Sequence, residues 1–245
     1  MQKFIYELVN NFLMNKVERE LINHLKNKEN IIFDVGCYRG NFTSNLIKFN
    51  KNNKKTKYYM FDANPNSRGY CKKVLDNKNV SFFELALDNT NKKKTFTINN
   101  YFEASGSSLR SAHEKDKLYN FTRRIVMFFF EPFKHKESYK KIIVQTQTLD
   151  KFCKQHKIKK INLLKLDTEG TEHQILLGAK NLLSKGKIDI IYSEVTGPKK
   201  IFKKKVKLIT DYLSKYNFKL AKTYKISSLG TLSNLQGSDN LFIRS

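Results

Sequence analysis

Three ionisable side chains alternate near the end of an apolar stretch in the second half of the chain. Lys165, Asp167 and Glu169 occupy every second position of Leu164-Lys-Leu-Asp-Thr-Glu-Gly170. Alternate residues of a β-strand point to the same face, so this pattern places the three side chains together until the chain turns at Gly170. Carboxylates that share a site with an ammonium group are suited to proton transfer. A structural salt-bridge network at a strand end is the alternative interpretation.

A second group of residues closes an apolar run earlier in the chain. Asp34, Gly36 and Gly40 follow Ile31-Ile-Phe33, with Tyr38 between the glycines. The continuous apolar run is typical of a parallel strand buried on both faces, and the glycines let the backbone turn and approach a ligand closely. The G-x-x-x-G spacing differs from the G-x-G-x-x-G of dinucleotide-binding loops, which argues against an NAD site. A plain tight turn is the alternative.

The second predicted strand, residues 57–62, also ends in a carboxylate. Asp62 lies 28 positions after Asp34 and is followed by Ala63. Doubly wound folds place an acid here that accepts hydrogen bonds from ribose hydroxyls, which a carboxylate can do with both oxygens. An acid that caps the helix after Pro65 is the alternative interpretation.

The third predicted strand, residues 79–86, leads to two further candidates. Leu87 and Asp88 lie where the adenine ring of a cofactor bound by Asp62 would sit. After a short predicted strand at residues 95–98, the periodicity of helices and strands is lost.

The segment from residue 99 to about residue 140 is predicted to be an insert. A loop this long is uncommon in a compact domain unless it is a lid or a binding element. We therefore expect it to recognise the second substrate, which binds beside the cofactor. Its candidate substrate-binding residues are Ser107, Ser108 and His113. For the phenylalanine-rich run that follows, three roles stay open: a lid, part of the core, or a shallow membrane contact.

The charge balance is strongly basic, with 47 lysines and arginines against 22 acids and a formal net charge of +25 at pH 7. Such a balance ordinarily indicates a nucleic acid or an anionic membrane as partner. Forty of the cations are lysine and only seven are arginine, whereas nucleic-acid readers favour arginine for bidentate contacts. No specific nucleic-acid partner is therefore expected, and weak contact with an anionic membrane stays compatible with the charge.

The order of elements predicts the fold class. Alternating strands and helices predict an α/β fold, a Rossmann-like doubly wound and mostly parallel seven-stranded sheet with helices on both faces. Residues 1–30 are expected to form a helical segment packed on one domain, residues 31–245. The cysteines show no paired spacing, and no apolar run approaches the roughly 20 residues of a membrane span. A cytoplasmic protein is expected.

Several motifs together resemble the FkbM family of S-adenosylmethionine-dependent O-methyltransferases. The resemblance covers about residues 31–194, and its most specific part is the K-x-D-x-E-G of Lys165 to Gly170, since glycine loops and second-strand acids are common to many methyltransferases. Cys37-Tyr38 replaces the usual Ala-Asn, and Asp62 stands where the family more often has glutamate. The stretches that carry it are Asp34-Val-Gly36 with Gly40, Phe61-Asp-Ala-Asn-Pro65, Ser107-Ser-Leu109, Thr148-Leu-Asp150, Leu164-Lys-Leu-Asp-Thr-Glu-Gly170 and Leu177-Gly-Ala179.

The resemblance implies S-adenosylmethionine as cofactor and methylation of a hydroxyl group, on a sugar, a glycan or a small metabolite. Asp167 is then the base or orienting acceptor for that hydroxyl, and Lys165 pairs with it or steadies oxyanion charge. Glu169 binds the acceptor or the other acids, and Glu194 is a substrate-binding candidate. The candidate cofactor-binding residues are Asp34, Gly36, Tyr38, Gly40, Asp62, Ala63, Leu87 and Asp88.

Two other activities and one metal hypothesis fit the same residues less well. An RNA methyltransferase would suit the charge, but no Asn/Asp-Pro-Pro-aromatic motif ends the fourth strand, where amino-methylating enzymes hold a flipped base. An oxidoreductase with a nucleotide cofactor lacks its G-x-G-x-x-G. No metal site is predicted, although Asp167, Glu169 and Glu194 offer oxygen ligands of the kind that suit magnesium.

Overall fold

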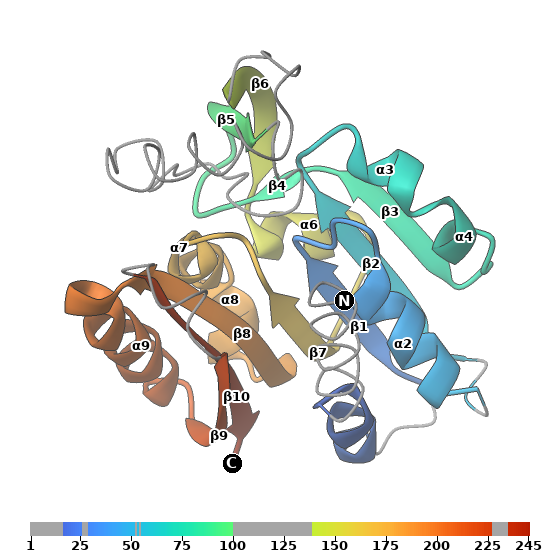
Figure 1. Ribbon diagram of the computed structural model, residues 1–245. Helices are drawn as coiled ribbons and strands as arrows, with labels where there is room; N and C mark the ends of the chain where they lie inside the picture. The colour runs from blue at the N-terminus through green and yellow to red at the C-terminus, as the bar shows by residue number, and fades with distance from the viewer. Residues whose placement is uncertain (1–16, 26–28, 52, 54, 100–138, 227–234) are drawn as a thin grey trace, which may run out of the picture.

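A seven-stranded sheet forms the centre of the computed structural model (Figure 1), which describes residues 17–25, 29–51, 53, 55–99, 139–226 and 235–245. Neighbouring strands are parallel as far as β8, and β10 is antiparallel to both β8 and β9. The predicted α/β class and mostly parallel seven-stranded sheet are confirmed. In spatial order the strands are β3 (Val80–Glu84), β2 (Lys57–Asp62), β1 (Ile31–Val35), β7 (Ile161–Leu166), β8 (Ile188–Pro198), β10 (Leu235–Arg244) and β9 (Phe218–Ile226).

The central strands are buried because apolar side chains extend from both of their faces. Every residue of β7 is buried, as is β1 after its first residue. Phe33 and Leu164 pack on one face, whereas Ile32 and Leu163 pack on the other. Neighbours in sequence thus enter different cores, which explains the continuous apolar runs of these strands.

Helices cover both faces of the sheet (Figure 1). On one face lie α2 (Asn41–Phe49) and helical residues 17–24, which bury Leu46 and Leu21 against the strands. The bounds 1–30 and 31–245 stay a prediction. The other face is covered by α6 (Leu149–Gln155), α7 (Glu172–Leu177), α8 (Lys180–Ser184) and α9 (Lys199–Ser214), while α3 (Ser67–Tyr70) and α4 (Lys72–Leu75) lie beside β3.

Two short helices follow Gly170, although the apolar side chains of this segment recur at the spacing of one helix. α7 ends at Leu177 and α8 begins at Lys180, with Gly178 between them. A Cβ on Gly178 would lie 2.2 Å from the backbone oxygen of Asp88. The break therefore admits the chain after β4 (Ala86–Leu87), a contact that periodicity alone cannot reveal.

Two of the family-like motifs meet at this break. The carboxylate of Asp150 accepts hydrogen bonds from the backbone N–H groups of Asn181 at 2.8 Å and Leu182 at 2.9 Å. It thereby caps α8 from the start of α6. The side chain of Thr148 caps α6 itself by accepting from the N–H of Lys151 at 3.2 Å. In the structure, Thr148 and Asp150 therefore cap helices.

A smaller sheet of three strands, in the order β4-β6-β5, stands at the carboxyl edge of the main sheet. Its other members are β5 (Lys93–Asn99) and β6 (Tyr139–Gln147), antiparallel to each other. The strand predicted at residues 95–98 is therefore confirmed as part of β5, but it belongs to this separate sheet. Its position follows from Leu85, whose N–H donates to the carbonyl of Asp62 at the end of β2.

The predicted insert begins and ends in this smaller sheet. β5 ends at Asn99 and β6 begins at Tyr139. The insert itself, with Ser107, Ser108 and His113, lies outside the described residues, and its role stays a prediction. Among the described residues, no helix is both long enough and apolar enough to cross a bilayer.

Candidate functional site

The strand register gathers charged side chains at the carboxyl edge of the main sheet. Asp34 of β1 pairs in register with Lys165 of β7. Glu194 of β8 lies opposite Asp239 of β10, and Asp167 directly follows the end of β7. Because alternate residues of a strand share a face, these five side chains form one group on the face that α2 covers.

Lys165 is the buried centre of this group. Its side chain is 8% exposed, and its Nζ lies 3.0 Å from Oδ1 of Asp34 and 3.2 Å from Oδ2 of Asp167. Burial by itself would lower the pKa of the Lys165 ammonium, but the two carboxylates raise it well above its usual value. The carboxylates thus favour the charged form of the lysine. It shows the pairing with Asp167 that the sequence predicts, while its catalytic role stays a prediction.

Asp34 supports Lys165 from inside the protein. Its residue is 1% exposed, and its second oxygen, Oδ2, accepts a hydrogen bond from Oγ1 of Thr43 at 2.8 Å. Both oxygens of the carboxylate are thus engaged by protein groups. These contacts make Asp34 a positioning residue for Lys165, and its predicted direct contact with the cofactor stays a prediction.

The remaining carboxyl groups share protons and hydrogen bonds. The charge of Asp167, followed by burial, raises the pKa of Glu194 well above its usual value, and the two side chains are hydrogen-bonded. The raised pKa favours the protonated form of Glu194. Oδ2 of Asp239 accepts from the hydroxyl of Tyr192 at 2.7 Å, and burial raises the pKa of Asp239 to about 6. The Asp167 side chain is 32% exposed, so solvent and ligands can reach it.

Glu169 does not continue the alternation that the sequence suggests. β7 ends at Leu166, and Glu169 adopts a left-handed conformation with φ 56°, followed by Gly170 with φ 103°. The prediction that three alternating residues share one strand face is therefore wrong at its third member. Glu169 still lies near the group, because its charge contributes to the raised pKa of Glu194.

Glu172 organises this turn and lies outside the predicted set of site residues. Its Oε1 accepts from the backbone N–H of Thr168 at 2.9 Å, from Oγ1 of Thr168 at 3.0 Å and from the N–H of Gly170 at 3.0 Å. The residue is 4% exposed. An acid in the first turn of a helix is favoured because it can accept from backbone N–H groups near the helix start, and its position is the signal in the sequence.

Glu18 is a second residue outside the predicted set. It belongs to helical residues 17–24, and both of its carboxylate oxygens accept from Nδ2 of Asn45 at 3.1 Å. Burial raises the pKa of Glu18 to about 7, against the opposing charge of Lys165. An acid on an amphipathic helix gives no sign in the sequence that it faces inward.

The loop after β1 lies directly against the loop after β7. Gly36 has φ 78°, and a Cβ on it would lie 1.8 Å from the backbone oxygen of Asp167. The N–H of Asp167 also donates to the carbonyl of Val35 at 3.0 Å. The space beside the Cα of Gly36 is therefore occupied by the backbone of Asp167. The sequence predicts that this glycine leaves room for a ligand, but in this direction it leaves room for a second backbone segment. The result is that the predicted cofactor loop and the predicted base are neighbours.

Asp62 ties the same loop to the end of β2. Its Oδ2 accepts from the N–H of Tyr38 and its Oδ1 from the N–H of Asn64, both at 2.8 Å. Neither bond comes from a backbone N–H of α3, although the side chain of Ser67, the first residue of that helix, is also close enough to lower the pKa of Asp62. Burial raises the pKa of Asp62, and the two amides oppose this shift. Each carboxylate oxygen can accept a second hydrogen bond, as ribose hydroxyls would require.

The other candidate cofactor residues surround this loop. Gly40, with φ 72°, directly precedes α2. Ala63 and Leu87 are buried apolar residues. Asp88 is 1% exposed, and its carboxylate pairs with the ammonium of Lys94. This pair fixes the chain after β4, and contact between Asp88 and an adenine ring stays a prediction. Within the described ranges, no three His, Cys, Asp or Glu residues form a group that could hold a metal ion.

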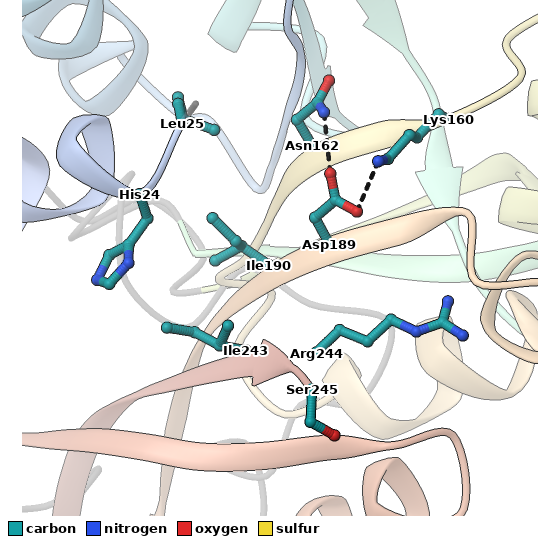
Figure 2. A pocket seen from close by; sticks show the side chains of 9 residues that line it. All are labelled: His24, Leu25, Lys160, Asn162, Asp189, Ile190, Ile243, Arg244 and Ser245. Carbon is teal, nitrogen blue, oxygen red and sulfur yellow. Dashed lines mark hydrogen bonds and ion pairs between the residues drawn. The ribbon is translucent and has the colours of Figure 1, made fainter. Parts of the chain in front are cut away.

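A pocket at the opposite edge of the sheet is shown in Figure 2. It is lined by the starts of β7 and β8, the end of β10, and His24 with Leu25. Oδ1 of Asp189 pairs with Nζ of Lys160 at 2.9 Å, and its Oδ2 accepts from Nδ2 of Asn162 at 3.0 Å. Lys160 and Asn162 thus both bind the carboxylate of Asp189, and the lining includes none of the candidate site residues.

Comparison with known proteins gives one family match and one curated relative. A family model described as the methyltransferase FkbM domain matches residues 34–220. The 2-O-methyltransferase NoeI of Sinorhizobium fredii is 25% identical over 186 residues, which cover 73% of this chain and 68% of NoeI.

Similar solved structures include TYW2 of M. jannaschii in complex with AdoMet, at 14% identity and a TM-score of 0.42 over 95% of this chain and 77% of that chain. Fibrillarin of Aeropyrum pernix with natively bound S-adenosyl-L-methionine is 8% identical, with a TM-score of 0.44 over 89% of this chain and 67% of that chain. At these values no conclusion about the substrate follows from them.

Proposed function

This chain belongs to the FkbM methyltransferase family, and on that premise we propose that it methylates a hydroxyl group of a sugar, a glycan or a small metabolite. The protein is an S-adenosylmethionine-dependent methyltransferase. The name of the relative NoeI, a 2-O-methyltransferase, supports oxygen as the accepting atom.

The residues of the loop after β1 fit S-adenosylmethionine. Asp62 holds this loop through the N–H of Tyr38 and keeps acceptor positions for the ribose hydroxyls. α2 starts directly after Gly40, so the positive end of that helix is available to the cofactor's carboxylate. When bound, the cofactor supplies a methyl group on a positively charged sulfur atom.

The exposed carboxylate of Asp167 is the observation that carries the proposal. It stands beside the cofactor loop, 3.2 Å from an ammonium group whose pKa the neighbouring carboxylates raise. Methyl transfer to a hydroxyl is an in-line displacement, in which the acceptor must be positioned and must lose its proton. We assign to Asp167 the acceptance of that proton from the acceptor hydroxyl.

The neighbours of Asp167 hold it in place. Lys165 pairs with it at 3.2 Å, and Asp34 holds Lys165 from the buried side at 3.0 Å. Glu194 is hydrogen-bonded to Asp167 and, in this proposal, also contacts the acceptor. Glu172 shapes the turn that carries Glu169 toward the same group.

The experiment is an acceptor screen with S-adenosylmethionine labelled in its methyl group. Soluble sugars, glycans, RNA and small hydroxylated metabolites are offered separately, and NMR of the labelled product identifies the atom that carries the methyl group. The matched control is the same acceptor without the methylated hydroxyl, which should receive no label. Label on a nitrogen or on RNA, with none on any hydroxyl of a sugar or metabolite, would overturn the proposal.

A further inference from the structure

Helix α9 carries a charged surface that methyl transfer does not use. It contains six lysines and one acid in 16 residues. Within the described part of the chain, Lys199, Lys200, Lys203 and Lys204 have no carboxylate within 4.0 Å and are exposed. Lys207 is also exposed and pairs with Asp211 at 2.8 Å. This is a dense array of lysines without a matching array of acids.

The lysines share one face of the helix with two exposed apolar side chains. At 3.6 residues per turn, the five exposed lysines fall within an arc of about 140°. Ile201 and Leu208, seven residues apart, flank one side of that arc and are 44% and 50% exposed. The opposite side of the helix buries Phe202, Ile209 and Leu213 in the core. We call Lys199, Lys200, Ile201, Lys203, Lys204, Lys207 and Leu208 the basic face.

The basic face begins beside the candidate site. α9 follows Pro198, the last residue of β8, so its first turns lie at the carboxyl edge of the sheet (Figure 1). Nζ of Lys205 donates to the carbonyl of Thr196 at 2.8 Å and lies 3.7 Å from where a Cβ on Gly170 would stand. α9 is thereby anchored to the turn that follows Asp167.

We propose that the basic face docks this protein on an anionic lipid bilayer, with α9 lying in the plane of the membrane surface. A cluster of lysines on one face of an amphipathic helix is a pattern that indicates binding to anionic lipid headgroups. Each lysine that lies near an anionic leaflet contributes a similar amount to the free energy of membrane binding. Docking by this face places the carboxyl edge of the sheet next to the bilayer.

The residue types favour a bilayer over a nucleic acid. α9 contains no arginine, and arginine is the side chain that binds phosphate groups and bases with two parallel hydrogen bonds. Exposed aliphatic side chains such as Ile201 and Leu208 gain from burial in the region between headgroups and acyl chains. They would gain nothing along a solvated phosphate backbone.

The test is co-sedimentation of the full chain with vesicles of phosphatidylcholine and phosphatidylglycerol, compared with vesicles of phosphatidylcholine alone. The triple variant Lys200→Glu, Lys203→Glu and Lys204→Glu should bind the anionic vesicles at least about tenfold more weakly. A control triple with the same charge change, Lys72→Glu, Lys73→Glu and Lys78→Glu on an exposed surface near β3, should bind like the wild type.

A second variant separates insertion from charge. Ile201→Ser with Leu208→Ser keeps every lysine and should weaken binding about threefold, most visibly at high salt, where attraction between charges is screened. Equal losses in the two lysine triples would overturn the proposal. The proposal would also be overturned if RNA displaced the protein from the vesicles and bound it more tightly than they do.

Each variant is also titrated with S-adenosylhomocysteine and tested for thermal unfolding. Unchanged values show that a loss of vesicle binding comes from the surface and not from the fold. Because this titration reports on the methyl-transfer site, failure of the docking inference and failure of the proposed function give different results.

Discussion

Similar ion pairs lie at the two ends of the central strands, here called the carboxyl edge and the amino edge of the sheet, but their surroundings differ. At the carboxyl edge, Asp167 is 32% exposed and pairs with Lys165 at 3.2 Å. At the amino edge, Asp189 is also 32% exposed and pairs with Lys160 at 2.9 Å. The lysines differ, since the side chain of Lys165 is 8% exposed and that of Lys160 is 47% exposed. One pair continues inward to the buried carboxylate of Asp34, and the other continues to the neutral amide of the buried Asn162.

This difference shows which structural feature is the better indicator of a reactive site. The amino edge has the pocket of Figure 2, in which Lys160 and Asn162 both bind the carboxylate of Asp189. The carboxyl edge has several carboxyl groups around one buried ammonium, and there the charge of Asp167 raises the pKa of Glu194. Raised pKa values arising from specific charged neighbours are a better guide to a reactive site than a hollow alone.

The largest difference between the edges is expected in turnover. Asp167→Asn removes the proton acceptor and should lower methyl transfer by about a thousandfold, within the range of lost general-base catalysis. Asp189→Asn makes the same chemical change at the amino edge and should leave turnover near that of the wild type. Initial rates with labelled S-adenosylmethionine measure both, and comparable rates for the two variants would remove Asp167 from the mechanism.

The next difference is expected in stability. Lys165→Met leaves the carboxylate of Asp34 buried without its partner and should lower the free energy of unfolding by about 3–5 kcal/mol. Lys160→Met breaks a pair that water already screens, so it should cost less than about 1 kcal/mol. Urea unfolding measures both values at one pH. Losses of equal size would show that burial does not distinguish the two edges.

The third difference concerns pH. Glu18 has a folded pKa of about 7 against a usual 4.5, so the folded state binds its proton more tightly than the unfolded state does. Its contribution to stability is therefore greatest below pH 4.5 and falls as the pH rises to 7, by at most about 3 kcal/mol.

Glu18→Gln removes this titration, because glutamine resembles the protonated acid. The variant should be more stable than the wild type at pH 8 and close to it at pH 5. Urea unfolding at the two pH values measures the effect. A variant that loses equal stability at both would show that Glu18 is held as a charged group.

At the carboxyl edge, the sequence predicts correctly those features that depend on residues close together in the chain. The pairing of Lys165 with Asp167 follows from alternation at a strand end, and the apolar runs of β1 and β7 follow from burial on both faces. Glu169 departs from its predicted face because the turn is held by hydrogen bonds to Glu172.

Other parts of the site depend on segments that are distant in the chain. Asp239 reaches the site through the pairing of β10 with β8, and Glu18 through packing of its helix on α2. Neither contact leaves a local pattern. The break at Gly178 is similar, because it depends on the backbone of Asp88.

One titration tests most directly whether the cofactor binds at the carboxyl edge. Gly36 and Gly186 both have positive φ, 78° and 62°, so alanine strains the backbone at either position. A Cβ on Gly36 would meet the backbone of Asp167 at 1.8 Å, whereas one on Gly186, at the amino edge, would meet the movable side chain of Arg244.

Calorimetry with S-adenosylhomocysteine on folded Gly36→Ala and Gly186→Ala gives the answer. The predicted result is that Gly36→Ala binds at least about tenfold more weakly than the wild type, a difference of about 1.4 kcal/mol, while Gly186→Ala keeps the wild-type affinity. Unchanged affinity in Gly36→Ala, or a loss confined to Gly186→Ala, would contradict the placement of the cofactor beside Asp167.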